Sequence, residues 1–521
     1  MDAWRRNPAR GESRPLPWRL LSGLVAIRLG LYLLSSGPLA YGTMSDEFYY
    51  IDCAERLAWG YVDHPPFSIA VLAASRSLLG DSRLALRLVP ALLGCALILL
   101  SALTARELGG GRAAQSLAAL STLVAPVFLA VTGFYSMNAF EPALWALAVL
   151  LIARIVNGGN PSRLWPPLGI VLGLALLNKI STLWFGAGIG VGLVLTRERR
   201  WLATRWPWLC FAIALLLFSP HIFWQLQNGW PTLEFMHNAA TQKMLSKSPL
   251  TIALDQLLAM NPALAPFWLA GLAWYFVAAE GKRFQWLAWI WITVLLILLA
   301  TGSARANYLA PAYAALLPAG GVAFERIARA RAWRWLPAAA AVAFVVTGAG
   351  EAPLAIDLLP PREYKAYERA IGVSAPVDQI DELGPMPLHF ALRFGWPELI
   401  GAVERAQAAL SPRERERAVV FGALFGDTAA VNFLGRARDL PRAISGHNSY
   451  WLWGPEGATG EVLLALAGSD ERLREWYEDV RRVAEIDCEY CMPGVARMGV
   501  YVCRRPRRPI AQWWPEAKIY Q

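Results

Sequence analysis

The sequence predicts a polytopic α-helical membrane protein of about 11 transmembrane helices, followed by a soluble α/β domain. Three observations support this prediction. Apolar residues make up 56% of the 521 residues and charged residues only 17%, whereas a soluble domain needs roughly 25% charge to cover its surface. Long apolar runs recur over the first part of the chain, and charges and prolines become frequent after it. We therefore expect a membrane domain at residues 1–350 and a soluble domain at residues 351–521.

The membrane domain is divided by its apolar runs, because a spanning helix needs about 20 mostly apolar residues. The expected spans lie near residues 18–40, 85–105, 113–133, 139–156, 164–177, 181–196, 206–226, 263–279, 284–301, 307–324 and 335–350. The two segments between residues 164 and 196 are short. They could be tilted or incomplete spans joined at Asn178 and Lys179.

Basic residues cluster in alternate connections between these spans, for example at residues 197–205, 282–283 and 326–334. Positively charged connections stay in the cytoplasm, so eleven spans place the N-terminus inside and residues 351–521 outside. The net charge of +10 is dispersed among apolar runs. We attribute it to this topology, and we expect membrane lipids rather than nucleic acid as partners.

The soluble domain is expected to be small and of mixed α/β type. Residues 418–422 and 500–502 are typical of strands, and residues 461–482 mix apolar and charged residues at helical spacing. Three cysteines lie near its end: Cys488, Cys491 and Cys503. In an oxidising compartment, two of the three could form a disulfide.

Acids and aromatic side chains alternate in the long connection after the first span, residues 41–84. Its candidate functional residues are Asp46, Glu47, Tyr50, Asp63 and His64. Aromatic faces stack on sugar rings, and carboxylates bind sugar hydroxyls or remove their protons, so this composition is typical of a carbohydrate site. Asp46 and Glu47 could equally be first-turn acids that match a helix dipole. A divalent cation could bind among these side chains, but their spacing is not diagnostic, and we assign no metal site.

Two motifs in this connection resemble a known family. Asp-Glu-Phe-Tyr-Tyr at residues 46–50 and Gly-Tyr-Val-Asp-His-Pro-Pro at residues 60–66 are similar to motifs of the multi-span, lipid-linked sugar transferases of the GT-C superfamily. The most similar members are of the glycosyltransferase family 39 type, related to protein O-mannosyltransferases and lipid A aminoarabinose transferases. The similarity continues at residues 137–142, 177–179, 261–262, 307–313, 447–450 and 453–455, so it extends over most of the chain.

The resemblance implies an inverting glycosyltransferase of the bacterial inner membrane. It would move a sugar from a polyprenyl-phosphate donor to a lipid, glycan or protein acceptor on the outer face, with residues 351–521 in the periplasm. Asp46 is implied as the catalytic base, with Glu47 beside it. The chemistry fits, because a lipid phosphate leaves as a stable anion while the acceptor hydroxyl is a poor nucleophile that needs one positioned carboxylate.

The chain departs from the family pattern at Asn138, where relatives often have an aspartate. Glu141 lies three residues on, on the same helical face, and could take its place, while Asn138 could hydrogen-bond the sugar. Lys179 could bind the donor phosphate or extend its amine to the lipid headgroups. Arg305 has the same two interpretations, and Tyr308 is more typical of an aromatic residue at the membrane interface.

A transporter or flippase of lipid-linked glycans is the alternative function. Transporters place charges near the middle of the membrane and often contain inverted repeats, whereas here the acids gather toward the outer side and the sequence has no obvious repeat. His64 could hold the 41–84 connection in shape or touch the substrate, and the residues alone leave both open.

Overall fold

The protein is described by a computed structural model over residues 15–302, 305–372 and 384–521. The chain divides into two compact units. The helical unit comprises Met1–Ala40, Asp81–Ile222 and Ser246–Leu359, and the mixed unit comprises Tyr41–Gly80, Phe223–Leu245 and Pro360–Gln521. Residues 41–80, which the sequence analysis places in the membrane domain, thus belong to the same compact unit as the C-terminal residues.

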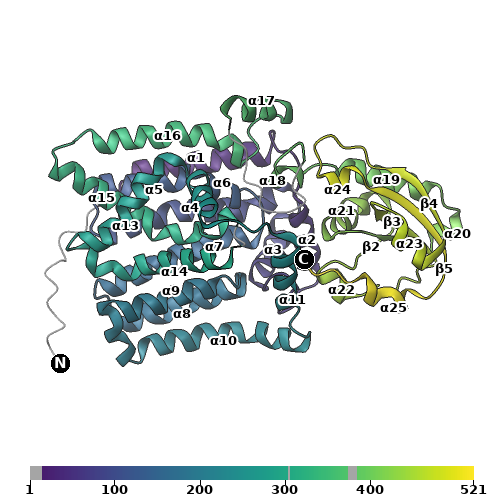
Figure 1. Cartoon of the computed structure of the whole chain (residues 1–521), viewed down its shortest axis with the longest axis horizontal. Helices are drawn as coiled ribbons and strands as arrows, with labels where there is room; N and C mark the ends of the chain where they lie inside the picture. Colours follow the sequence, from purple (N-terminus) through teal and green to yellow (C-terminus); the bar gives the residue numbers. More distant parts are fainter. Residues whose placement is uncertain (1–14, 303–304, 373–383) are drawn as a thin grey trace. The chain divides into compact units, whose positions relative to one another are not determined.

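The helical unit consists of helices that lie mostly alongside one another (Figure 1). They are α1 (Trp18–Ser36), α4 (Arg83–Glu107), α5 (Arg112–Val124), α6 (Pro126–Val131), α7 (Met137–Val156), α8 (Pro161–Asn178), α9 (Thr182–Leu195), α10 (Trp206–Gln227), α12 (Pro249–Ala259), α13 (Ala265–Val277), α14 (Gln285–Thr301), α15 (Leu316–Ala330) and α16 (Leu336–Ala355). Apolar runs fold this way in lipid because a helix pairs its own backbone N–H and C=O groups.

Six helices among the described residues are long and apolar enough to cross a membrane, or up to seven if a bent pair counts as one span. The six are α1, α4, α7, α10, Gly281–Thr301 and α16, and the bent pair is Pro249–Ala259 with Pro262–Val277. The expected count of about 11 is not reached by this criterion. Other expected spans fall on shorter or interrupted helices. Residues 113–133, for example, divide into α5 and α6 at Pro126, because proline cannot donate the helical hydrogen bond.

Two glycines of α9 allow this helix to pack closely on α14. A Cβ atom at Gly188 would lie 2.8 Å from the Cα of Ile290, and one at Gly192 would lie 2.2 Å from a ring carbon of Trp286. Small residues four positions apart let helix backbones approach closely in membranes, where apolar burial provides little driving force. The close packing fixes α9, whose N-terminus follows the segment that contains Lys179.

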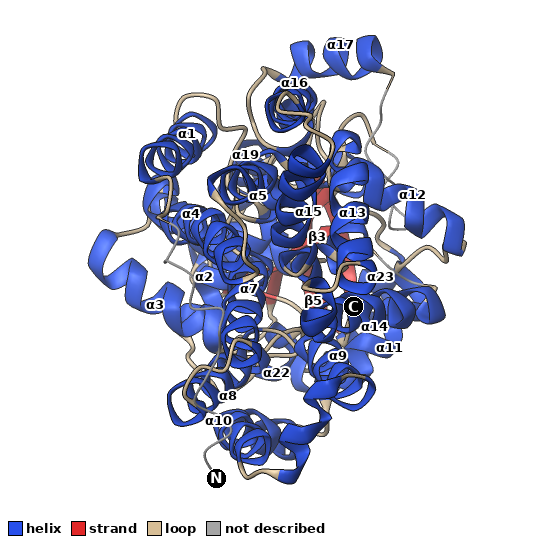
Figure 2. Ribbon diagram, turned by 90° about the vertical axis from the view of Figure 1, so that its left-hand side faces the viewer, coloured by secondary structure: helices blue, strands red, loops and turns tan. Residues whose placement is uncertain are grey.

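A five-stranded sheet forms part of the mixed unit, with strand order β2-β1-β3-β5-β4. The strands are β1 (Ala418–Phe421), β2 (Ala443–Ile444), β3 (Val462–Ala467), β4 (Tyr477–Glu485) and β5 (Gly499–Pro506), drawn in red in Figure 2. β1 is parallel to β2 and β3, and β5 is antiparallel to β3 and β4. In this register Val420 lies opposite Ala443 on one side and Leu464 on the other.

The expected strands at residues 418–422 and 500–502 fall on β1 and β5. The helical pattern expected at residues 461–482 is wrong for most of its length, because β3 and β4 occupy its two ends and only α23 (Glu471–Trp476) is helical. β3 is a continuous apolar run whose residues are nearly all buried, as is typical of a central strand. Pairing of both strands with β5 outweighs the local spacing of charges.

Short helices complete the mixed unit. They are α2 (Ser45–Glu55), α3 (Phe67–Leu79), α11 (Pro231–Asn238), α17 (Pro361–Ile371), α18 (Leu388–Ala391), α19 (Trp396–Ala408), α20 (Pro412–Arg415), α21 (Phe425–Leu434), α22 (Ser449–Trp453), α24 (Pro493–Ala496) and α25 (Ile510–Trp513). α2 packs against α3 within the acid-rich connection and against α21, so this connection is held by a segment that is remote in sequence.

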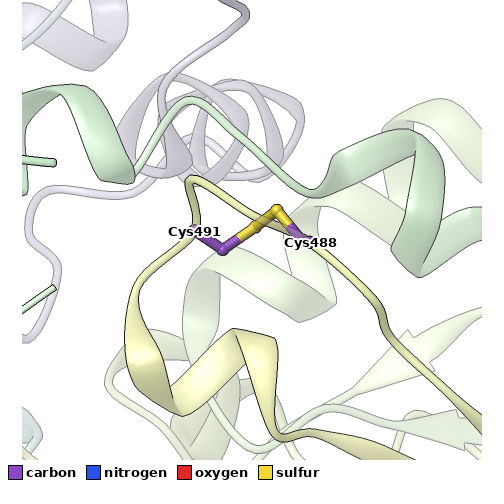
Figure 3. Close-up of a disulfide and its surroundings, with 2 residues drawn as sticks. All are labelled: Cys488 and Cys491. Atoms are coloured by element: carbon purple, nitrogen blue, oxygen red, sulfur yellow. A yellow bond between two sulfur atoms is a disulfide. The ribbon is translucent and has the colours of Figure 1, made fainter. Parts of the chain in front are cut away.

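One disulfide joins Cys488 to Cys491 in the loop between β4 and α24, as Figure 3 shows. Cys503 is buried in β5 and keeps a free thiol. Of the pairings that the sequence leaves open, the structure thus has the one between the two loop cysteines. Their sulfur atoms lie against Gly395, where an added Cβ would be 2.3 Å from the sulfur of Cys491.

Candidate functional site

The predicted site residues other than Arg305 fall into two clusters, one within each unit. We call them the loop cluster, around α2 in the mixed unit, and the junction cluster, around the connection of α8 with α9 in the helical unit. The loop cluster contains Asp46, Glu47, Tyr50, Asp63 and His64, and the junction cluster contains Asn138, Glu141, Lys179 and Tyr308.

The two neighbouring acids at the start of α2 have different surroundings. The carboxylate of Glu47 accepts a hydrogen bond from the backbone N–H of Met44 at 2.9 Å, and Glu47 is only 1% exposed. It therefore forms part of a helix cap, which satisfies a backbone donor at the end of α2. Asp46 is partly exposed, and the hydroxyl of Ser45 lies 3.3 Å from its Oδ1 atom. Of the pair, Asp46 is the acid that a substrate hydroxyl could approach.

Tyr49, one turn after Asp46, links α2 to the rest of the 41–80 segment. Its hydroxyl donates to Oδ1 of Asp63 at 2.9 Å and lies 2.8 Å from the hydroxyl of Ser449. Burial raises the pKa of Tyr49 well above its ordinary value, and the nearby charge of Asp63 acts in the same direction. Tyr49 therefore stays protonated and holds Asp63, which is 16% exposed at its side chain.

His64 is enclosed by aromatic rings. Its ring centroid lies 4.7 Å from that of Tyr50 and 4.9 Å from that of Tyr61, and the residue is 0% exposed. Its Nε2 atom lies 3.9 Å from Asp63, beyond hydrogen-bond distance. This packing supports the interpretation that His64 maintains the shape of the loop.

Sequence reasoning missed the buried acid Asp52, six residues after Asp46 on α2. Its Oδ2 atom accepts hydrogen bonds from the hydroxyl of Tyr450 and, at 2.8 Å, from the amide of Asn432. Burial raises the pKa of Asp52, and the two hydrogen bonds and the charge of Arg56 oppose this increase. The signal in the sequence is an acid placed among Ile51 and other apolar residues in the middle of a short helix.

The junction cluster is centred on Lys179. Its amine donates to Oδ1 of Asn138 at 2.9 Å and to Oε2 of Glu141 at 2.8 Å, and it lies 5.1 Å from the centre of the Tyr308 ring. The hydroxyl of Ser181 donates to the other carboxylate oxygen of Glu141. Two of the three N–H donors of the lysine are thus engaged, and the lysine and glutamate charges offset each other.

Local structure explains how these side chains meet. α8 ends at Asn178 and α9 begins at Thr182, so the chain breaks where the sequence predicts, and Lys179 has extended backbone angles. The amide of Asn178 donates to the carbonyl of Met137 at 2.9 Å, which holds the break against the first turn of α7. Ser136 caps that turn by accepting a hydrogen bond from the backbone N–H of Asn138 at 3.2 Å.

Arg305 is not brought into the junction cluster, because none of the contacts found among the described residues joins it to Lys179 or Glu141. It precedes the short η5 helix (Ala306–Tyr308), and its backbone carbonyl accepts from the N–H of Tyr308 at 3.0 Å. Within the part of the chain that the structure describes, its buried Nε atom has no hydrogen-bond partner. Arg305 thus lies close to Tyr308 in sequence, but it has no part in the contact of Tyr308 with Lys179 that the described residues make.

The sequence leaves open a divalent cation among the acids of the 41–84 connection. Over residues 15–302, 305–372 and 384–521, the structure gathers no group of three His, Cys, Asp or Glu side chains that could hold a metal ion. The geometry of Asp46, Glu47, Asp63 and His64 therefore adds no support to a metal site.

Comparison with known proteins identifies the fold. A family model described as dolichyl-phosphate-mannose-protein mannosyltransferase matches residues 63–224. ArnT from Cupriavidus metallidurans in the apo state is similar over 93% of this chain and 98% of that chain, with a TM-score of 0.59 and 17% sequence identity. The chain has the fold of ArnT. The same protein bound to undecaprenyl phosphate matches over the same shares, with a TM-score of 0.58 and 16% identity.

The predicted resemblance to the GT-C sugar transferases is confirmed by these matches. The mannosyltransferase family model and the fold also confirm the predicted class of enzyme, a glycosyltransferase in a membrane protein of mostly helical structure. The family match includes Asp63, Asn138, Glu141 and Lys179 and begins after Asp46. No curated protein sequence matches the chain significantly.

Proposed function

We propose that this protein transfers a sugar from a polyprenyl-phosphate donor to an acceptor hydroxyl, with inversion, at the outer face of a bacterial inner membrane. Asp46 acts as the general base. The observation that supports this role is the different surroundings of the paired acids: Glu47 is buried in the cap of α2, whereas Asp46 is partly exposed at the same helix start. A lipid-linked donor is supported by the similarity to ArnT, whose structure contains undecaprenyl phosphate.

The reaction is a single displacement. The Asp46 carboxylate takes the proton of the acceptor hydroxyl while the hydroxyl oxygen bonds to the anomeric carbon of the sugar. The bond from that carbon to the phosphate oxygen breaks, and the electron pair leaves with the polyprenyl phosphate. One displacement inverts the anomeric configuration, and the acceptor is a hydroxyl of a lipid, glycan or protein.

In this proposal Lys179 binds the phosphate of the donor. A cation stabilises the charge that develops on the leaving phosphate, and the Lys179 amine has one N–H donor beyond those given to Asn138 and Glu141. Asn138 and Glu141 orient the lysine, and Tyr308 covers it. Tyr50, Asp63 and Arg305 are proposed as further substrate-binding residues, and His64 is proposed to maintain the shape of the loop cluster.

The proposed topology keeps about 11 spans, and this number includes the short and broken helices as well as the long ones. The N-terminus is then cytoplasmic and residues 351–521 form a periplasmic α/β domain. The pattern of basic connections supports this arrangement.

The test is a single-turnover transfer assay with purified protein and a panel of polyprenyl-phosphate sugars, with products detected by mass. Asp46→Asn should lower the rate by about 10²–10⁴-fold, because that is the usual contribution of a general base. Donor affinity should be retained, since the amide keeps the size of the carboxylate. Glu47→Gln is the matched control, and it should affect stability more than rate.

Two outcomes would contradict the proposal. If Glu47→Gln loses turnover while Asp46→Asn keeps it, the base is the neighbouring residue. If the protein moves lipid-linked sugars across vesicles without forming any new product mass, it is a transporter and the transfer chemistry is wrong.

A further inference from the structure

Asp52 is a buried carboxylate that the reaction described above does not use. It is 1% exposed, so no substrate can reach it. Its Oδ2 atom is held by the Tyr450 hydroxyl and by the Asn432 amide at 2.8 Å, and Arg56 lies 4.0 Å away. These partners come from α21, α22 and the end of α2 itself. Asp52 thus joins three segments through one buried carboxylate.

Burying a carboxylate is costly, and its partners offset the cost only when their geometry is well defined. An apolar side chain would fill the same space without this cost. A fully satisfied polar network selects one arrangement of its elements, because any other arrangement leaves a buried group unpaired. The contacts of Asp52 therefore specify how α2 lies against α21 and α22.

A second contact of the same kind lies one helical turn earlier. The hydroxyl of Tyr49 is 2.8 Å from that of Ser449, which also accepts from the backbone N–H of Val62 at 3.1 Å. Ser449 and Tyr450 are consecutive residues at the start of α22. We call the two contacts, Tyr49 with Ser449 and Asp52 with Tyr450, the α2–α22 tether.

Two contacts three residues apart determine both the rotation of α2 about its axis and its position along that axis. Asp46 lies on the same helix, three residues before Tyr49. Its direction is therefore set by the tether, together with the hydrogen bond from the backbone N–H of Ser45 to the carbonyl of Leu392 at 3.0 Å.

We propose that Asp52 and Tyr450 are positioning residues for the sugar transfer, which act by orienting α2 so that Asp46 meets the acceptor hydroxyl. This inference rests on the proposed role of Asp46. Small displacements of a catalytic group reduce rates strongly without changing substrate affinity. Loss of the tether should therefore lower kcat and leave the KM for the donor unchanged.

The test uses the full-length protein with Tyr450→Phe, Asp52→Leu, which keeps the volume but removes the acceptor oxygen, and the double variant. Each single variant should lower kcat by about tenfold, and the double variant should be little slower than either, because both changes remove one contact. Tyr477→Phe is the matched control. Its buried hydroxyl donates to the carbonyl of Gly460 at 2.8 Å in the same unit, and because Gly460 lies in neither α2 nor α22, loss of this bond should leave kcat unchanged.

A background with Asp46→Asn separates positioning from a merely structural role. Tyr450→Phe should cause no further loss of rate there, since the residue acts through a base that is already absent. A full tenfold loss in that background would overturn the inference, as would wild-type kcat in the single variants. If Asp46→Asn itself keeps normal turnover, the proposed function fails instead, and the two failures are thus distinguishable.

Discussion

The ion pair between Lys179 and Glu141 determines what each residue can do for a donor phosphate. Both side chains are largely buried, at 12% and 3% exposure. Glu141 offsets the lysine charge and takes one of its hydrogen bonds, so a donor phosphate would use the third N–H of an amine whose charge is already partly offset. The ion pair thus orients the Lys179 amine and lowers the affinity of that amine for an anion.

We predict that Lys179→Met weakens donor binding by roughly ten- to hundredfold, the range expected when a hydrogen bond to a charged group is lost. Glu141→Gln should retain or increase donor affinity, because the lysine charge is no longer offset. Binding of a fluorescent polyprenyl phosphate measures both. The double variant with Lys179→Met and Glu141→Gln leaves no charge at the pair. It therefore shows whether the loss in Lys179→Met comes from leaving Glu141 buried and unpaired. Equal losses from the two single changes would show that the cluster is only structural.

His447 gives the mixed unit a dependence on pH. Its Nδ1 atom accepts from the backbone N–H of Phe425 at 3.2 Å, so we assign the ring proton to Nε2, which donates to the carbonyl of Gln521 at 2.9 Å. Burial lowers the pKa of His447 to about 4, although the bond to Gln521 opposes this shift. As pH falls, the unfolded chain takes up the proton first, near about pH 6.5.

The stabilisation associated with neutral His447 is therefore complete above about pH 6.5 and is lost as pH falls toward 4. We predict that His447→Gln is less stable than the wild type at neutral pH but loses less stability on acidification, by up to about 3 kcal/mol. Unfolding followed by tryptophan fluorescence at several pH values tests this. Parallel pH curves for the two proteins would contradict it.

At the scale of elements, the disulfide of the β4–α24 loop lies against Gly395, and the next residue, Trp396, contacts the backbone just before α2. The sulfur atoms of Cys488 and Cys491 contact Gly395, and the indole N–H of Trp396 donates to the carbonyl of Thr43 at 2.8 Å. The ring of Tyr490, between the two cysteines, lies 5.7 Å from that of Phe394. The loop thus supports the backbone that precedes Asp46.

Replacing Cys488 and Cys491 by serine should lower the stability of the mixed unit by about 2 kcal/mol, the entropic value for so short a loop. Added reductant should have the same effect on the wild type and none on the serine variant, which is the control. Thermal unfolding with and without reductant measures this. Cys503→Ser should not remove the response to reductant, because that thiol is free.

Local sequence predicts elements well where the signal itself is local. The break at Asn178 and Lys179 is visible because two short apolar runs meet at a polar pair. The contact of Lys179 with Asn138 and Glu141 is not predicted by the sequence, although both segments belong to the motifs of the resemblance. The bond between Asp52 and Tyr450 joins residues 398 positions apart, and no periodicity encodes it. The helical prediction for residues 461–482 is wrong for a related reason. β3 and β4, at the two ends of this range, pair with β5, which comes later in the chain.

At the scale of the whole molecule, the distribution of basic residues predicts the orientation in the membrane. A reporter fused after Arg200 should lie in the cytoplasm, and one fused after Leu359 should lie in the periplasm, because positively charged connections are retained inside. Paired alkaline phosphatase and fluorescent protein fusions distinguish the two sides. Signals from the same side at both positions would contradict the eleven-span arrangement.

The α2–α22 tether has a consequence for the order in which the chain is made. Tyr49 and Ser449 are separated by 400 residues, so at about 5–20 residues per second α2 waits roughly 20–80 s for its partner during synthesis. Through this interval Asp52 is hydrated and charged, which makes α2 less prone to stick to other nascent segments than an apolar helix would be. The carboxylate that is costly to bury in the finished protein thus helps, with the other three acids of α2, to keep this helix compatible with water until α22 has been made.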